Sequence, residues 1–342
     1  MRKHVLKIAA VLALTAVFLY FFGKSAKWTE VLKYIAGVNF PLFLLLFPLA
    51  ALHFVTRGLR WRYLLIHEKR DVRLSHMIAG NVVGFTVTFL FPGRLGELVK
   101  PLYLARKEDI RRGYAIGTVV VERIFDMFTM CLFLGLFLIA RPLFARFFSL
   151  DAEATKRLDF WGIVGVACAT GLLILILLLY IFKDKALRAA AALLKPLPEK
   201  FRGAVLELVH EFIDGLRFFH SAGNLLMYAL LSGVVWLGII FLYWVFFLAC
   251  HVSVPYFLVV PYVFLTMVGA SIPTPGMVGG FDWFSKVALT SFYHIDPNLA
   301  VGMTLVVHAI QIVVTCVLGY VILWREGMSL FQLRKMGESE KP

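Results

Sequence analysis

The sequence has little charge for its length. Of its 342 residues, 16% are charged and 61% are hydrophobic, whereas soluble domains carry about 25% charged residues. A water-soluble fold could not bury that much apolar surface. Several uninterrupted apolar stretches reach the roughly 20 residues that a helix needs to cross about 30 Å of hydrocarbon. The composition therefore excludes a soluble enzyme and predicts an all-α polytopic membrane protein.

Cysteine is scarce as well. The four cysteines are Cys131, Cys168, Cys250 and Cys316, and each falls in or at the edge of an apolar stretch without C-x-x-C spacing. This pattern argues against a disulfide framework and against a zinc site. We expect buried thiols that act as small hydrophobic side chains, and we expect no metal and no cofactor.

Positive charge is in excess, with a formal net charge of +14. A nucleic-acid-binding protein would gather its Lys and Arg on one solvated face. Here they form clusters between apolar stretches, as the positive-inside rule requires of cytoplasmic loops. The distribution of positive charge therefore predicts which loops face the cytoplasm, and we expect no nucleic acid partner.

Six apolar stretches are long enough to span a membrane, namely residues 5–23, 40–57, 114–140, 161–182, 225–250 and 299–324. The first is longer than the 7 to 15 residues of a signal-peptide core, so we expect it to remain uncleaved. Residues 24–38 have an apolar face that suits the outer interface. Basic residues place both termini, the segment from Arg57 to Arg73, an amphipathic linker at 183–221 and the tail at 325–342 in the cytoplasm.

Two further apolar segments, residues 77–105 and 256–293, are each interrupted by proline and glycine. A kinked crossing by the first would put the basic cluster between Arg106 and Arg112 outside, so we favour a re-entrant hairpin over a full span. The segments occupy corresponding places in halves 1–182 and 222–324. Such symmetry predicts an inverted repeat with its site between the hairpin tips.

Proline and glycine are expected to shape these tips, because proline lacks an N–H and glycine permits unusual dihedrals and close approach. The residues concerned are Pro92, Gly93, Gly96, Pro273, Pro275, Gly276 and Gly279.

The first hairpin carries the first group of candidate site residues. Arg94, Glu97 and Lys100 are spaced i, i+3, i+6, so they can pair on one helix face. A broken helix end beside Arg94 can also present free amides and a guanidinium to an anion. The alternative is that Arg94 and Glu97 only neutralise each other and hold the hairpin.

A second group lies about eight residues into the span at 114–140. Glu122, Arg123 and Asp126 share one helix surface there. Charges at that depth are too costly to face lipid, so they must meet a cavity or partners in the bundle. A purely structural ion-pair network is the alternative.

The second hairpin and the last span add two further candidates. Asp282 can cap the helix that follows the break, and we favour this role over substrate contact. His308 belongs to a polar stripe with Thr304, Gln311 and Thr315. A hydrogen-bonded packing histidine is favoured there, with a proton carrier as the alternative.

At these motifs the chain resembles the lysylphosphatidylglycerol synthase transmembrane-region family, also called the flippase-like domain family. The resemblance covers most of the chain and rests on four segments, namely residues 57–61, residues 92–97, Glu122-Arg123 with Asp126, and Pro275-Gly276 with Gly279 and Asp282. The family pattern usually has a second glycine where Met277 stands and a Glu where Asp282 stands. Synthase members carry a large soluble domain after the membrane region, and this chain ends about 18 residues beyond its last span, so we expect no synthase activity.

The resemblance and the ionisable residues together predict a lipid translocase of an inner membrane, not an enzyme. Its substrate would be a membrane lipid with an anionic or zwitterionic phosphate headgroup. Burying a phosphate requires cationic partners, of which Arg94 is the first choice, followed by Arg123 and Lys100.

Two alternatives remain at the level of sequence. A membrane-embedded lipid-modifying enzyme is disfavoured because the carboxylates all lie close to cations and would be poor general acids. A non-transporting scaffold would not explain two broken helices with ionisable residues at depth. The sequence leaves a homo-oligomer open.

Overall fold

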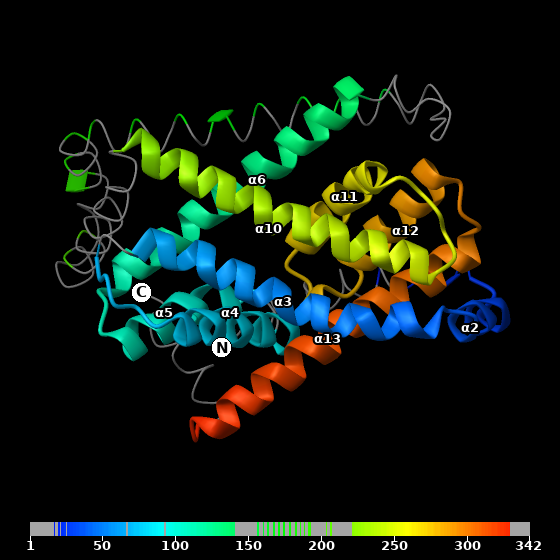
Figure 1. Ribbon diagram of the computed structural model, residues 1–342, viewed down its shortest axis with the longest axis horizontal. Coiled ribbons are helices and arrows are strands. Elements are labelled where there is room, and N and C mark those ends of the chain that lie inside the picture. The colour runs from blue at the N-terminus through cyan, green and yellow to red at the C-terminus, as the bar shows by residue number, and fades with distance from the viewer. Residues whose placement is uncertain are drawn as a thin grey trace.

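The computed structural model describes residues 26–65, 68–91, 94–140 and 221–328, together with single positions between 17 and 24 and between 156 and 206. Within these residues the chain is helical and contains no strand, as the composition predicts. The helices are α2 (Trp28–Ala36), α3 (Phe40–Leu65), α4 (Leu74–Leu90), α5 (Gly96–Glu108), α6 (Arg112–Ala140), α10 (Ala222–Ala249), η3 (Tyr256–Val259), α11 (Val260–Ser271), η4 (Pro275–Met277), α12 (Gly280–Tyr293) and α13 (Pro297–Arg325) (Figure 1).

Four of these helices, α3, α6, α10 and α13, are long and apolar enough to cross a membrane. They correspond to four of the six spans predicted from the sequence. The other two spans, at 5–23 and 161–182, lie outside the continuously described residues, as do the linker at 183–221 and most of the tail at 325–342.

The outer faces of these helices are apolar. On α10, the side chains of Leu226, Leu230, Val234 and Leu237 are exposed and recur every three or four residues along one side. A stripe of this kind would be unfavourable in water and suits contact with lipid tails. The described part of the protein is thus a helical membrane domain.

The helix α3 is longer than the span predicted for it. It continues past Arg57 to Leu65, and the Arg57 and Arg60 side chains are 5% and 0% exposed. The span predicted to end at Arg57 is therefore part of a longer helix, in which these arginines are buried in the bundle. The helix continues because no proline or glycine pair stops it and because α6 supplies carboxylates that pair with both guanidinium groups.

The two broken segments form helical hairpins, α4 with α5 and α11 with α12. Glycines allow the paired helices to touch backbone to backbone. A methyl group at Gly96 would overlap the carbonyl oxygen of Gly84, and a methyl group at Gly269 would lie 2.6 Å from the carbonyl oxygen of Gly280. Gly96 thus lies at a close approach of two helix backbones, and the second hairpin has the same kind of contact.

Unusual backbone angles form the tips. In the first hairpin Arg94 has a φ of 54°, while Pro92 and Gly93 lie outside the described residues. In the second, Gly276 and Gly279 have φ values of 63° and 89°, as expected for residues that shape a turn. Pro273 is exposed in the turn, and Pro275 begins η4.

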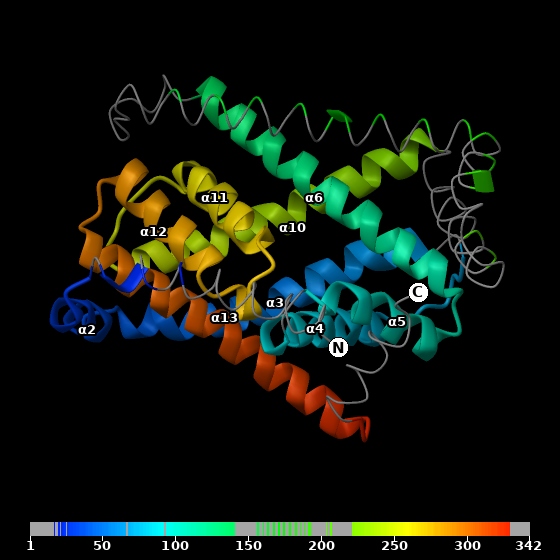
Figure 2. The ribbon, with the colours of Figure 1, turned by 180° about the vertical axis from the view of Figure 1, so that it is seen from behind.

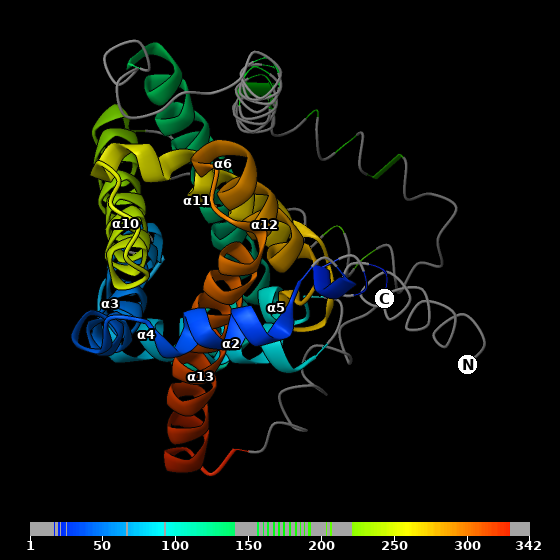
Figure 3. The ribbon, with the colours of Figure 1, turned by 90° about the vertical axis from the view of Figure 1, so that its right-hand side faces the viewer.

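The contacts between elements relate the two halves. The helices α3 and α10 run antiparallel side by side, and the hairpins lie toward opposite ends of the long axis (Figures 1 and 2). The helix α4 of the first half contacts α13 of the second half, and the corresponding helix α11 of the second half contacts α6 of the first half. In the same way, α3 contacts α13, and α10 contacts α6. Exchanging the halves therefore exchanges these four contacts with one another. Seen along the long axis, α3 and α10 form one layer beside the others (Figure 3).

Candidate functional site

Charged side chains from three helices meet in the interior. Asp126 on α6 accepts a hydrogen bond from Arg60 Nη1 at 2.6 Å and from Trp236 Nε1 at 3.0 Å. Glu122, one turn earlier and fully buried, lies 3.3 Å from Arg60 and 3.4 Å from Arg57. Two carboxylates of α6 thus hold two arginines of α3 inside the bundle.

The first hairpin adds a lysine to this group. Lys100 Nζ donates to Glu122 Oε2 at 2.6 Å and lies 4.3 Å from the centre of the Trp61 ring. The Lys100 side chain is 3% exposed. Trp61 is itself fixed by donation from Nε1 to Thr118 Oγ1 at 2.9 Å. Lys100 therefore ties α5 to α6 in a closed environment.

A more open set lies beside this core. Arg94 pairs with Glu97 at 3.2 Å, as their spacing predicts, and donates to the Ser271 carbonyl oxygen of the second hairpin at 3.4 Å. Arg123 lies 3.4 Å from Asp126 and 3.7 Å from Glu97. The side chains of Arg94, Glu97 and Arg123 are about one third exposed, at 28%, 34% and 32%. The structure thus brings six predicted residues into one ionic cluster.

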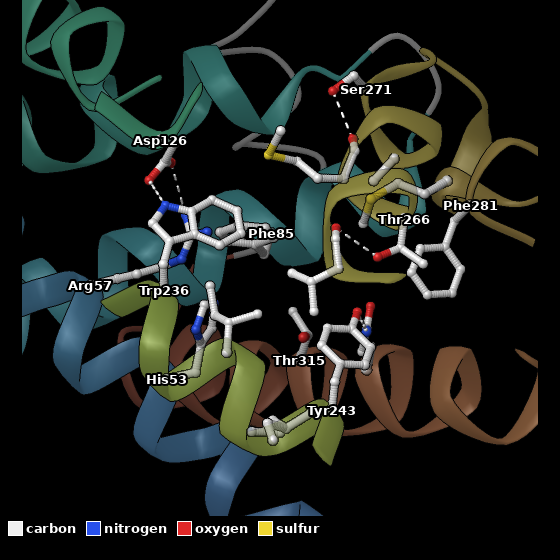
Figure 4. A pocket seen from close by; sticks show the side chains of 18 of the residues that line it. His53, Arg57, Phe85, Asp126, Trp236, Tyr243, Thr266, Ser271, Phe281 and Thr315 are labelled. Carbon is white, nitrogen blue, oxygen red and sulfur yellow. Dashed lines mark hydrogen bonds and ion pairs between the residues drawn. The ribbon is translucent and has the colours of Figure 1, made fainter. Parts of the chain in front are cut away.

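A cavity of about 490 Å³ opens beside the ionic cluster, where the two hairpin tips meet. Arg57, Arg94, Glu97, Arg123 and Asp126 form its charged end. Most of the remaining wall is apolar and aromatic, and it includes Phe54, Phe85, Phe89, Trp236, Tyr243, Met267 and Phe281. Figure 4 shows Arg57 and Asp126 at one end and Tyr243 and Phe281 at the other. The cavity is therefore amphipathic.

The ionic cluster, counted together with Arg57 and Arg60, has more positive than negative groups. Arg57, Arg60, Arg94, Lys100 and Arg123 face the carboxylates of Glu97, Glu122 and Asp126. With each group in its usual charge state, five cations meet three anions, which leaves an excess of two positive charges. Buried charge of one sign is costly unless a counter-charge accompanies it.

Several donors of these arginines also make no hydrogen bond with a described residue. The Nε atoms of Arg57, Arg94 and Arg123 are buried and make no hydrogen bond with any described residue, although all three arginines line the cavity. An arginine fork with free donors is suited to an oxyanion such as phosphate or carboxylate. The cavity thus has an anion-binding end and an apolar body.

Asp282 takes a different position from the other predicted site residues. Its Oδ2 accepts from the backbone N–H of Gly279 at 2.8 Å and caps α12, and it is absent from the cavity lining. His308 contacts Asp282 Oδ1 at 2.7 Å, so the histidine is hydrogen-bonded, as favoured from the sequence. Lys100 does not line the cavity either, which argues against the headgroup contact expected of it.

Sequence reasoning missed Arg57 and Arg60 as site residues. Both were assigned to a cytoplasmic segment because basic residues usually mark that side. Their spacing carried a better signal, since Arg57, Arg60 and Trp61 are i, i+3 and i+4 and share one helix face with His53. Polar residues that repeat on one face of a span usually point inward.

Comparison with known proteins places this fold in a family. The sequence pattern described as the lysylphosphatidylglycerol synthase TM region matches residues 7–319. The chain is also similar to the UPF0104 membrane protein MJ1595 of Methanocaldococcus jannaschii, with 21% identity over 94% of this chain and 95% of the relative. No solved structure matches the chain significantly. Because the match covers most of its length, the chain belongs to the lysylphosphatidylglycerol synthase transmembrane-region family.

Proposed function

We propose that this protein is a lipid translocase that moves a lipid with a phosphate headgroup between the leaflets of an inner membrane. The observation that carries the proposal is the amphipathic cavity, whose charged end contains arginine donors that make no hydrogen bond with a described residue and whose body is apolar. A headgroup phosphate would enter the charged end while the tails remain in hydrocarbon. The excess of two positive charges suits an anionic group better than a neutral one.

The arrangement of the halves supports a transport mechanism. Six spans and two re-entrant hairpins, related as an inverted repeat with both termini cytoplasmic, would put the hairpin tips near the middle of the membrane. The four described contacts that exchange with one another when the halves are exchanged are consistent with this topology. Broken helices that meet at mid-depth are the usual place for a transported substrate in such repeats.

Different members of the ionic cluster would have different tasks. Arg94 and Arg123 are partly exposed on the cavity and would contact the phosphate, together with Arg57. Arg60 and Lys100 are enclosed and contact Glu122, so they would fix the positions of the carboxylates. Glu122 and Asp126 would in turn orient the arginines that face the cavity.

The variant Arg94→Ala tests the proposal in proteoliposomes that contain a fluorescent phosphatidylglycerol. The measured quantity is the rate at which labelled lipid from the inner leaflet becomes accessible to a quencher outside the vesicles. We expect a loss of at least about tenfold, because removing one charge-assisted contact in an apolar site costs more than about 1.4 kcal/mol. Arg94→Lys should retain part of the rate, since charge remains and the fork is lost.

The matched control is Arg111→Ala, because Arg111 pairs with Glu68 on the exposed surface, away from the cavity. This variant should move lipid at the wild-type rate. Full movement by Arg94→Ala at equal reconstitution would contradict the assigned role. Chemically altered lipid in the recovered vesicles would favour a lipid-modifying enzyme, and no movement by wild-type protein would favour a scaffold.

A further inference from the structure

The second hairpin is joined to α13 by one buried histidine. His308 and Asp282 are 5% and 3% exposed, and His308 Nδ1 lies 2.7 Å from Asp282 Oδ1. The other ring nitrogen, Nε2, lies 3.0 Å from the carbonyl oxygen of Gly276 in the hairpin tip. The rings of Phe281 and Phe89 lie against the imidazole, with centroids at 4.8 Å and 6.3 Å. A single side chain thus bridges α12, the tip and α13.

These two contacts require an extra proton. A carbonyl oxygen and an ionised carboxylate can only accept hydrogen bonds, and a neutral imidazole carries one N–H. Both contacts are hydrogen bonds only if the pair is an imidazolium with a carboxylate, or a neutral imidazole with a protonated carboxyl. Either form holds one proton more than neutral His308 beside ionised Asp282. We propose that the His308–Asp282 pair is a proton-binding site that couples proton uptake to lipid movement, which rests on the translocase function proposed above.

Loss of the proton would weaken the link between the hairpin tip and α13. Without the proton, a ring nitrogen of His308 that carries no hydrogen would face an oxygen acceptor, either the Asp282 carboxylate or the Gly276 carbonyl. Two acceptors in contact are unfavourable in a buried site surrounded by aromatic rings. Asp282 Oδ2 would keep its hydrogen bond from the Gly279 N–H, so the contact that is lost would be one of those made by His308. The proton would pass to water that reaches the parted tip, and the reverse step would take one proton from water.

The same tip forms part of the cavity wall. Met277 and Phe281, which flank the histidine contacts in sequence, line the cavity together with Thr315 of α13. A methyl group at Gly276 would lie 3.2 Å from the carbonyl oxygen of Phe89, which lies near the end of α4 at the tip of the first hairpin. Releasing the tip would therefore change both the cavity wall and the contact between hairpins.

Other titratable groups surround the pair. Lys286 follows Asp282 by one turn on α12 and lies over the Trp283 ring, and Tyr262 on α11 shares a hydrogen bond with Ser285. On α10, Tyr243 accepts from Gln311 of α13. Ordinary lysine and tyrosine side chains change charge near pH 10, whereas histidine does so near neutrality. The described residues of α4 and η4 at the pair, Phe89 and Gly276, do not titrate.

Two measurements on the full-length protein test the site. The first is the melting temperature in nanodiscs between about pH 5.5 and about pH 8.5, the range in which a histidine changes charge. The second is lipid movement over the same range in proteoliposomes with equal pH on both sides. The variants are His308→Gln, which keeps hydrogen-bonding capacity without titrating, and Asp282→Asn. The control is His251→Gln, because His251 is exposed and its ring Nε2 lies 3.0 Å from the Gly37 carbonyl oxygen.

We expect the wild-type melting temperature to fall as pH rises, because the proton that stabilises the native tip is lost. His308→Gln and Asp282→Asn should lack this pH dependence, and His251→Gln should keep it. Lipid movement by wild type should change about tenfold or more across the range, since one titrating site can change its occupancy about tenfold per pH unit. His308→Gln should respond less than about twofold.

Wild-type pH dependence of both quantities in His308→Gln would overturn the proposal. If no protein moves lipid but the pH dependence of melting disappears in His308→Gln, the proton site stands and the translocase function fails. If lipid movement is present and equally pH-dependent in wild type and His308→Gln, the translocase function stands and the proton site fails.

Discussion

At the scale of single residues, Glu122 has the most demanding position in the molecule. It is fully buried and meets Lys100 at 2.6 Å, Arg60 at 3.3 Å and Arg57 at 3.4 Å. Removing its charge would leave Arg57 and Arg60 with Asp126 as their remaining close carboxylate among the described residues, and Lys100 with no close carboxylate among them. The cluster is favourable only when it is complete, because each buried charge has lost its hydration and needs an opposite charge to compensate for that loss.

Glu122→Gln should therefore destabilise the protein by about 3 to 5 kcal/mol, the range for breaking a buried ion pair. Glu97→Gln is the matched control, since the Glu97 side chain is 34% exposed and such pairs contribute about 0 to 1 kcal/mol. Thermal unfolding of both variants in the same detergent gives the comparison. Equal losses would show that Glu122 does not organise the cluster.

Glu108 forms a separate polar cluster at the end of α5. Burial alone would raise the pKa of Glu108, but hydrogen bonds from Lys69, the Arg73 N–H and His76 outweigh it and hold that pKa below its ordinary value. A carboxyl group whose pKa is lowered by folding stabilises the folded state above its unfolded pKa and loses this effect as pH falls through its folded pKa.

Glu108→Gln should consequently melt below wild type at neutral pH, and the difference should shrink as the pH is lowered below about 4. Melting curves of the two proteins across the acidic range test this expectation. A melting difference that stays constant from neutral to acidic pH would mean that the carboxylate charge contributes nothing. In that case the side chain would act only by its shape and neutral hydrogen bonds.

At the scale of elements, each hairpin depends on a contact between glycines. Gly84 and Gly96 join α4 to α5, and Gly269 and Gly280 join α11 to α12. The obstacle to any side chain at these positions is backbone, which cannot move aside as a flexible side chain would. The two halves have reached the same packing solution with different surrounding sequences.

Gly96→Ala should destabilise the first hairpin by about 1 to 3 kcal/mol or more, the range for overpacking a filled interior. Gly135→Ala is the control, because a methyl group there has no described atom within 4 Å and alanine favours a helix. The readout is the melting temperature together with the yield of monodisperse protein. Wild-type stability of Gly96→Ala would show that the helices of the hairpin can separate without cost.

At the scale of the whole molecule, the proposed topology makes a clear prediction about the first hairpin. Arg106 lies just before the end of α5 and is exposed, and Ser253 lies in the exposed loop after α10. If α4 and α5 enter and leave on the same side, position 106 is cytoplasmic and position 253 is external. A single kinked crossing would instead put position 106 outside.

Single cysteines at these two positions, in a background without the four native cysteines, can be labelled in intact cells with a membrane-impermeant maleimide. We expect Ser253→Cys to react from outside and Arg106→Cys to react only after the membrane is opened. Reaction of both from outside would remove the first re-entrant hairpin. The inverted repeat would then fail as well, since its two halves would no longer correspond.

The sequence by itself determined the class of the protein, four of its long helices, the places where two apolar segments break, and six residues of the ionic cluster. These follow from local properties, namely hydrophobic length, the missing N–H of proline, and the cost of a charge in hydrocarbon. The i, i+3 pairing of Arg94 with Glu97 is of the same kind, because one helical turn decides it.

Only the tertiary structure decided which charges meet. The spacing of Arg57 and Arg60 indicates one shared helix face, but the carboxylates that pair with them lie about 65 residues away on α6. The enclosure of Lys100 against Trp61 likewise depends on a neighbour from another segment. The cavity exists only because two hairpin tips from distant parts of the chain come together, which no local pattern encodes.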